Sequence, residues 1–427
     1  MLLTALLLLF GLIALSVPIA ATLGVLGISM SEFFTTMPMY RAIGEMAWST
    51  STETLLIAIP LFVMIGEILL RAGITRKMYE GMAQWLSWLP GGLMHSNIGA
   101  CTLFAATSGS SIATAATIGT VAVPEIDRRG YNERLFLGTI AAGGTLGILI
   151  PPSINMIVYG LLTNTSIPEL YLAGFIPGLV LAALFMATIV ALCLYRKEWG
   201  GSKIETSWQR RVAALPSLLP PLLIFLLVVG SIYAGVATPT EAASLGVVGA
   251  LILAAANRTL TFDMLKHACE ATMRTTAMIM LIIVAALFLN FVLTTIGLTQ
   301  QLTQFIKSLG LTPFQVMVLI VVFYTLLGCV METMSLMITT APLITPIVVA
   351  LGYDPVWFGI LLMVLLESSL ITPPIGVNLF VVHSVRRRGP LKDVFIGAIP
   401  FVVTLFLMAI LLLVFPQLAL WLPKLFY

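Results

Sequence analysis

Apolar residues recur along the 427-residue chain in long runs that are separated by short segments rich in glycine, proline or charge. Many of these runs reach about 20 residues, the length of helix that spans the hydrocarbon core of a bilayer. Transmembrane barrel strands instead alternate polar and apolar residues in segments of about 10, and this chain does not. The pattern predicts an all-α polytopic membrane protein.

The first apolar run, Leu2–Ser16, continues past Pro18 to Met30 and has no basic residues before it. A secretory signal peptide carries such a basic region. We therefore expect a retained membrane helix here.

Composition narrows the class further. Only 9% of the residues are charged and 59% are apolar, whereas soluble domains carry roughly 25% charged residues. So few charges cannot coat the surface of a soluble protein of this size. The net charge of +3 gives no reason to expect a nucleic-acid partner, and the four cysteines have no metal-binding or disulfide spacing.

The chain contains an internal duplication with an offset of 222 positions. Ala20–Gly27 recurs as Ala242–Gly249, and Pro151-Pro152 recurs as Pro373-Pro374. Shared membrane-helix composition explains the first match poorly and the paired prolines not at all. We infer two repeats.

Charge placement predicts that the two repeats are inverted. Three arginines follow Pro124, at positions 128, 129 and 134, whereas no basic residue follows the equivalent Pro346 until Arg386. Basic loops stay in the cytoplasm. Two equivalent loops, of which one is rich in basic residues and the other is not, should therefore lie on opposite sides of the membrane. Threading the chain in this way leaves only Arg41, Lys307 and Lys424 of the 21 basic residues outside.

Four segments follow from this topology. Residues 1–195 form the first repeat, with scaffold helices, an arm helix, a hairpin, a broken helix and a following span. Residues 196–211, which include Lys203, form a basic cytoplasmic linker. Residues 212–392 form the second repeat, and residues 393–427 form a C-terminal membrane helix. Arg386-Arg387-Arg388 is interpreted as a topology anchor.

Several apolar stretches are too short to span. Gly92–Ala106 and Ile112–Pro124 flank the polar segment Thr107–Ser111, and each arm is only about 20 Å of helix against roughly 30 Å of hydrocarbon. A re-entrant hairpin with its tip near the midplane fits this pattern. The second repeat has the equivalent segments Pro313–Gly328, Cys329–Thr333 and Met334–Pro346.

A helix broken by paired prolines follows each hairpin. Leu135–Leu149 leads into Pro151-Pro152, and Trp357–Leu370 leads into Pro373-Pro374. Two prolines remove donors and unwind the helix. Unwound backbone at membrane depth offers carbonyl oxygens to cations, and half-helix N-termini attract anions. We therefore predict two pseudo-symmetric midplane sites.

These features resemble the large membrane subunit of the tripartite ATP-independent periplasmic (TRAP) transporters, over nearly the whole chain. The motifs that carry the resemblance are Ser108-Gly109-Ser110-Ser111 with Ala113, Gly147 through Ser153, Gly328 through Glu332, and Thr372 through Phe380.

The resemblance implies an ion-transporter-like inverted-repeat elevator fold with two re-entrant hairpins and two broken helices. It implies a sodium-coupled transporter in the bacterial inner membrane and not an enzyme. It also implies two partners, a small four-helix membrane subunit and a periplasmic solute-binding protein. The expected substrate is an organic acid such as a C4-dicarboxylate, sialic acid or another sugar acid.

Sodium prefers hard oxygen ligands, so we expect at least two sodium ions at the tips and breaks. The first cage is expected to draw on Ser108, Gly109, Ser110, Ile150, Pro151 and Ser153. The second is expected to draw on Gly328, Glu332, Thr333, Ser369, Thr372 and Gly376. The residues expected to contact substrate are Ser111, Asn155, Ser335 and Asn378.

Several alternatives remain at this point. Glu332 is either a charge near a bound cation or a structural acid bonded to backbone donors, and Glu367 is assigned a supporting role. An intramembrane serine hydrolase lacks a histidine base near the tip serines, and a channel explains the paired breaks less well than alternating access. The nearest rival is a stand-alone sodium/dicarboxylate carrier, which would need no binding protein.

Overall fold

The computed structural model describes residues 1–202 and 204–427, so Lys203 of the predicted linker lies outside the described residues. Helices dominate the chain, and the described residues contain no strand beyond one isolated bridge between Tyr131 and Gly200. The all-α prediction is confirmed.

The first half contains α1 (Leu2–Ala14), α2 (Ile19–Phe34), η1 (Met39–Ala42), α3 (Ile43–Ser51), η2 (Thr54–Ile57), α4 (Ala58–Arg71), α5 (Ile74–Leu86), α6 (Leu93–Ser108), α7 (Ser111–Ala122), α8 (Pro124–Arg129), α9 (Glu133–Thr145), α10 (Ile154–Thr163), α11 (Ile167–Tyr195) and η3 (Lys197–Trp199). The second half contains α12 (Trp208–Tyr233), α13 (Pro239–Ala256), α14 (Phe262–Thr295), α15 (Leu298–Ser308), α16 (Pro313–Gly328), α17 (Thr333–Ala350), α18 (Pro355–Ile371), α19 (Val377–Arg386), α20 (Leu391–Val414), α21 (Gln417–Leu420) and α22 (Pro423–Phe426).

Seven helices among the described residues are long and apolar enough to cross a membrane. They are Thr54–Arg71, Ile167–Tyr195, Trp208–Tyr233, Pro239–Ala256, Phe262–Thr295, Thr333–Ala350 and Leu391–Val414. The chain is therefore a multi-pass membrane protein.

The duplication seen in the sequence reappears in the helices. α7 begins at Ser111 and α17 at Thr333, again 222 positions apart. α9 and α18 begin at the same offset, and each is capped by an acceptor just before it. Asn132 accepts a hydrogen bond from a backbone N–H of α9, and Asp354 accepts two from α18. These side chains satisfy donors that the first helical turn leaves free.

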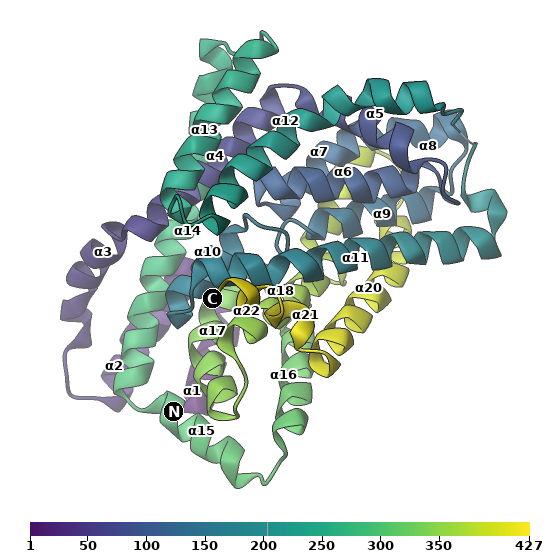
Figure 1. Ribbon diagram of the computed structural model, residues 1–427. Coiled ribbons are helices and arrows are strands. Elements are labelled where there is room, and N and C mark those ends of the chain that lie inside the picture. The colour runs from purple at the N-terminus through teal and green to yellow at the C-terminus, as the bar shows by residue number, and fades with distance from the viewer. Residues whose placement is uncertain (203) are drawn as a thin grey trace.

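The two helical pairs that the sequence predicts as hairpins lie in different parts of the molecule. In Figure 1, α6 and α7 lie in the upper half of the view and α16 and α17 in the lower half. Within each pair the helices contact each other. The broken helix α9–α10 accompanies the first pair, and α18–α19 accompanies the second.

Three predicted boundaries are wrong. The N-terminal run forms two helices, because the chain turns at Ser16, which has a positive φ of 59°, and α2 starts after Pro18. α17 continues past Pro346 to Ala350, with Pro342 and Pro346 inside the helix. It is therefore long enough to cross a membrane, contrary to the prediction of a short arm. Membrane helices tolerate such prolines where neighbours satisfy the freed backbone groups. α9 ends at Thr145, before the predicted Leu149.

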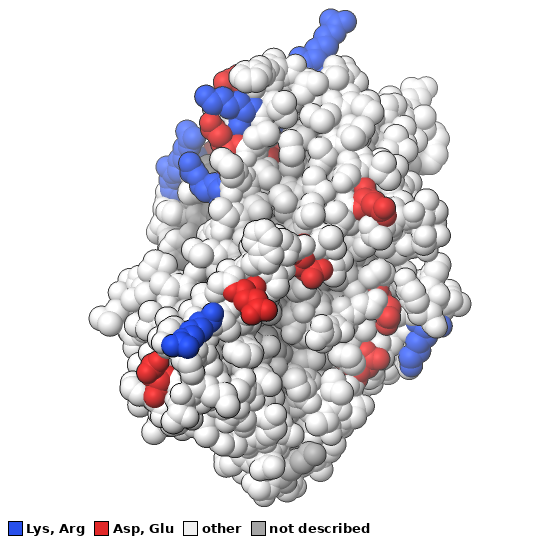
Figure 2. All heavy atoms as spheres, turned by 90° about the vertical axis from the view of Figure 1, so that its left-hand side faces the viewer, with Lys and Arg blue, Asp and Glu red and all other residues white. Residues whose placement is uncertain are grey.

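Most basic residues on the face in Figure 2 lie at one end of the molecule. The blue Lys and Arg side chains are concentrated at the upper end, whereas most of the red Asp and Glu side chains lie lower on this face. Arg386 is buried, with 3% of its side chain exposed, and pairs with Glu133 at 2.7 Å and Asp393 at 3.3 Å. Arg388 contacts Asp127 at 2.6 Å and lowers the pKa of that carboxyl. Arg386 therefore connects α9, α19 and α20 through ion pairs. This structural role is additional to its interpretation as a topology anchor.

Candidate functional site

The first tip is a tight turn between α6 and α7 that contacts the first break. Gly109 has a φ of +59°, and a Cβ there would lie 2.7 Å from the carbonyl oxygen of Pro152. Glycine is therefore needed for both the backbone conformation and the close approach. Ser110 then caps α7 by accepting a hydrogen bond from the N–H of Ala113 at 3.4 Å. Ser108 lies beside this turn, and its hydroxyl contacts that of Thr114 at 3.1 Å.

The first break begins earlier than the prolines. After Thr145 the chain continues in tight turns in which Leu149 donates to the carbonyl of Leu146. Gly147 allows the tip to approach, because a Cβ there would lie 2.8 Å from the backbone of Ser110 and Ser111. The structure thus brings the predicted first tip and first break together.

The first break also holds a buried oxygen with no partner. Ser153 precedes α10 and is fully buried, and its hydroxyl has no hydrogen-bond partner in the described structure. Ile150 and Pro151 are buried beside it. An unpaired buried hydroxyl is costly, so Ser153, with neighbouring carbonyls, fits a hard cation such as sodium.

The second tip is capped by a carboxylate. Glu332 accepts hydrogen bonds from the N–H groups of Met334 at 3.0 Å and Ser335 at 2.9 Å. It also accepts from the hydroxyls of Thr333 at 2.9 Å and Ser335 at 3.1 Å. Glu332 stands 222 positions after Ser110, so the two repeats place different caps at equivalent helix starts.

The second tip contacts the second break. Gly328 ends α16, and a Cβ there would lie 2.5 Å from the Cβ of Ser369. The hydroxyl of Ser369 donates to Leu366, and that of Thr372 donates to Ser368, both at 2.6 Å. Their oxygens keep lone pairs for a cation. Gly376 has a φ of +34° and immediately precedes α19.

A contact between equivalent positions joins the two repeats. The hydroxyl of Thr145 donates to Glu367 Oε2 at 3.3 Å, across a separation of 222 residues. Two equivalent residues can touch only near the axis that relates the repeats. Glu367 is fully buried, and its other carboxylate oxygen has no hydrogen-bond partner in the described structure. This places Glu367 between the two tip-and-break regions.

A cavity of about 560 Å³ opens between the two tips and the helices α2 and α14. The predicted site residues that line it are Gly109, Ser110, Ser111, Asn155, Glu332, Thr333 and Ser335. The predicted site residues outside its lining are Ser108, Ile150, Pro151, Ser153, Gly328, Ser369, Thr372, Gly376 and Asn378. The amide of Asn378 instead donates to Ala141 at 3.2 Å, between α19 and α9.

Two helix N-termini at this cavity are suited to an anion. Among the described residues, its lining contains no lysine or arginine. The N-termini of α7 and α10 reach it, and so does that of α17, where the N–H groups of Met334 and Ser335 are already bonded to Glu332. Helix N-termini carry partial positive charge and free N–H groups. Asn155 adds a buried amide nitrogen with no hydrogen-bond partner in the described structure. The hydroxyls of Ser111 and Thr333 already donate, to Thr145 and Glu332 respectively. Glu332 is the one acidic residue among the described lining residues, and its carboxylate accepts the hydrogen bonds of the cap.

The structure also identifies lining residues that the sequence did not reveal. Thr275 and Met278 reach the cavity from α14, and Ile148 reaches it from the first break. Thr275 is a polar residue in a long, mostly apolar helix. This polarity was the one feature of the sequence that pointed to it. It offers a hydroxyl from the side opposite the tips.

Comparisons with known proteins agree with this architecture. The family model described as "Tripartite ATP-independent periplasmic transporter, DctM component" matches residues 6–418. The chain is 32% identical to the C4-dicarboxylate TRAP transporter large permease protein DctM of Vibrio cholerae, over 98% of this chain and 96% of that protein. It is also 32% identical to the sialic acid TRAP transporter large permease protein SiaM of the same organism, over 87% of this chain and 86% of that protein.

One solved structure shares the fold. The YdaH transporter of Alcanivorax borkumensis superposes with a TM-score of 0.60 at 17% identity. The match covers 87% of this chain and 89% of that chain.

Proposed function

The chain belongs to the DctM family of large membrane components of tripartite ATP-independent periplasmic transporters, and from this premise we propose that it imports an organic acid by sodium-coupled transport. The acid is a C4-dicarboxylate, sialic acid or another sugar acid; similar proteins are named for the first two.

The observation that carries the proposal is the cavity between the two tips. The N-termini of α7 and α10 and the unpartnered amide nitrogen of Asn155 reach it, and its described lining contains no lysine or arginine. Such a site holds a carboxylate through helix dipoles and N–H donors. A weakly held anion can be released again, which transport requires.

Sodium is proposed to bind at each tip and break. The donors are carbonyl oxygens and hydroxyls, and the buried hydroxyl of Ser153 has no hydrogen-bond partner in the described structure. A cation beside the cavity would offset the charge of the incoming acid. Substrate and sodium would therefore bind more tightly together than either binds alone.

The movement is proposed to be an elevator. The hairpins α6–α7 and α16–α17 would re-enter the membrane from opposite sides and, with the broken helices, slide against a scaffold that includes α2 and α14. The separation of the two pairs in Figure 1 supports this arrangement. The basic end in Figure 2 would face the cytoplasm of a bacterial inner membrane.

The family implies two partners, a small four-helix membrane subunit and a periplasmic solute-binding protein. To test the proposal, the chain and its small subunit are reconstituted into liposomes and uptake of a C4-dicarboxylate is measured. We expect uptake only with the binding protein and an inward sodium gradient. Robust uptake by this chain alone would favour the stand-alone carrier, and equal uptake in sodium-free buffer would refute the coupling.

A matched pair of variants tests the cavity. Asn155→Ala removes the unpartnered amide and should lower the apparent substrate affinity about tenfold, because a site built to hydrogen-bond its ligand loses that bond. The control is Asn164→Gly. Asn164 lies at the opposite, exposed end of α10, where its φ of 52° suits glycine. This variant should leave transport unchanged. Equal behaviour of the two variants would remove the cavity from the proposal.

A further inference from the structure

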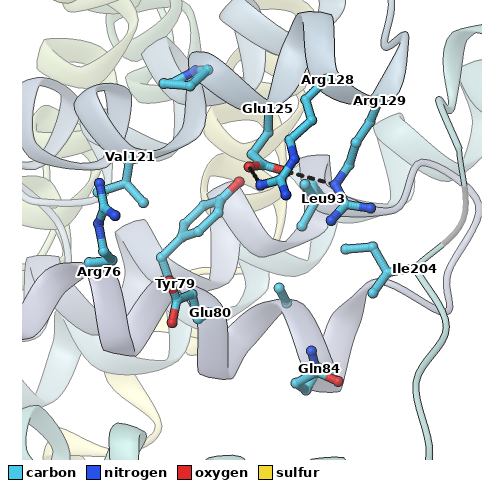
Figure 3. A pocket seen from close by; sticks show the side chains of 12 residues that line it. Arg76, Tyr79, Glu80, Gln84, Leu93, Val121, Glu125, Arg128, Arg129 and Ile204 are labelled. Carbon is cyan, nitrogen blue, oxygen red and sulfur yellow. Dashed lines mark hydrogen bonds and ion pairs between the residues drawn. The ribbon is translucent and has the colours of Figure 1, made fainter.

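A second cavity lies at the basic end of the molecule, away from the tips. It has a volume of about 390 Å³ and lies between α5 on one side and α7 and α8 on the other. Figure 3 shows Arg128 and Arg129 beside Glu125 on α8, and Arg76 on α5 extending toward Val121. Glu80 and Gln84 of α5 also belong to the lining and lie at the lower side of that helix in this view. The first tip and its break take no part in this lining.

The charges around this cavity do not balance. Arg128 and Arg129 share one carboxylate, Glu125, at 3.3 Å and 2.6 Å. Within the described residues, neither Arg76 nor Glu80 has an ion-pair partner in the structure. Three guanidinium groups therefore border the cavity against two carboxylates, and they come from helices some fifty positions apart in the sequence.

Buried hydrogen bonds between side chains hold α5, one wall of this cavity, in place. The hydroxyl of Tyr79 donates to Asn97 at 2.8 Å, and the amide of Asn97 donates to Thr139 at 2.8 Å. Tyr79 is 3% exposed, and Asn97 and Thr139 are fully buried. These bonds fix α5 against α6 and α9, so the cavity is preformed.

The remaining lining is suited to a ligand that is partly apolar. Leu93, Val121 and Ile204 are part of it. Gln84 Oε1 is buried and has no hydrogen-bond partner in the described structure, so it can accept a bond from a ligand hydroxyl. The volume lies within the range of about 300–1,000 Å³ that is usual for small-molecule sites.

We propose that this cavity binds a phosphate group, carried by an anionic phospholipid or by a soluble phosphate ester. Guanidinium groups pair with phosphate oxygens in bidentate fashion, and basic pockets between membrane helices on the cytoplasmic side bind lipid headgroups. The positive-inside rule accounts for arginines at this end. It does not require guanidinium groups from two helices to border one cavity.

A bound phosphate would bridge α5 and α8. Because α5 is the amphipathic arm and α8 follows the first hairpin, the ligand would stabilise the contact between these two parts of the protein. The inference does not depend on the transported substrate or on sodium, and it is tested without a transport assay.

The test measures thermal unfolding of the purified chain in a neutral detergent. Short-chain phosphatidylglycerol, phosphatidylcholine of the same chain length, and inorganic phosphate at constant ionic strength are titrated separately. Phosphatidylglycerol should raise the unfolding midpoint, and phosphatidylcholine should not. If inorganic phosphate acts equally well, the ligand is a soluble phosphate; if only phosphatidylglycerol acts, it is a lipid headgroup.

Two variants locate the effect. Arg76→Gln breaks no ion pair in the described structure, so it should fold normally but need about tenfold more phosphatidylglycerol for the same shift, because it loses a charge-assisted bond. Arg274→Gln changes an exposed arginine on α14 that does not line the cavity, and its response should match that of the unmodified chain. No shift with either phosphate ligand, or an unchanged response of Arg76→Gln, would overturn the proposal.

Discussion

Glu332 is the residue whose replacement tests most sharply what the second tip does. Its carboxylate accepts four hydrogen bonds, two from backbone N–H groups and two from hydroxyls. Replacing a helix cap by alanine costs about 0.5–2 kcal/mol, and a charged acceptor with four bonds belongs at the upper end of that range. Glu332→Ala should therefore lower the free energy of unfolding by about 2 kcal/mol, roughly a 30-fold change in the unfolding equilibrium constant.

Glu332→Ser is the matched variant, because Ser110 caps the equivalent helix of the first repeat. It keeps a hydroxyl cap and removes the charge, so it should recover most of the stability. Both free energies are measured by titrating the protein in mixed micelles with sodium dodecyl sulfate. If Glu332→Ala unfolds at the same detergent fraction as the unmodified chain, the reasoning about the cap is refuted.

The same two variants separate the two interpretations of Glu332. A carboxylate about 8–16 Å from a bound cation contributes about 1–2 kcal/mol at an effective dielectric constant of about 20. Glu332→Ser should then raise the sodium concentration for half-maximal uptake about five- to thirtyfold, although the helix is still capped. Unchanged sodium dependence in a stable Glu332→Ser protein would leave Glu332 as a structural acid alone.

Three further predictions concern the sodium cages, the ion pairs and the orientation. Ser110→Ala and Thr372→Ala should each raise the half-saturating sodium concentration several-fold in reconstituted uptake, whereas Thr372→Ser should not; normal sodium dependence in both alanine variants would place the cages elsewhere. Arg386→Gln should destabilise the protein by about 2 kcal/mol in detergent titration, because Glu133 and Asp393 lose their buried partner but keep Arg388 and Arg134; a loss below about 0.5 kcal/mol would contradict this. In intact cells, on a cysteine-free background, Asn164→Cys should react with an impermeant thiol reagent and Lys392→Cys should not, and the opposite result would reverse the topology.

The sequence allowed prediction of the parts of the site where the backbone itself is constrained. Gly109 permits the left-handed backbone of a tight turn, and the paired prolines at positions 151 and 373 interrupt a helix, so these residues indicated the first tip and both breaks. The residues that reach the cavity only through helix packing were harder to predict from the sequence. Thr275 lies in an apolar helix where threonine commonly bonds its own backbone, and only the approach of α14 to the tips reveals it. The cap formed by Glu332 was one of two open interpretations because it depends on the turn geometry.

The bond between Thr145 and Glu367 also bears on how such a chain arises. A symmetric pair of separate, identical subunits would place the same side chain on both sides of the axis. Two glutamates would repel each other there, and two threonines would supply no carboxylate. Joining both copies in one gene removes this restriction, because each copy then mutates independently. A single carboxylate at the centre, with a hydroxyl donor opposite, is thus an arrangement that gene fusion makes available and an unfused homodimer cannot reach.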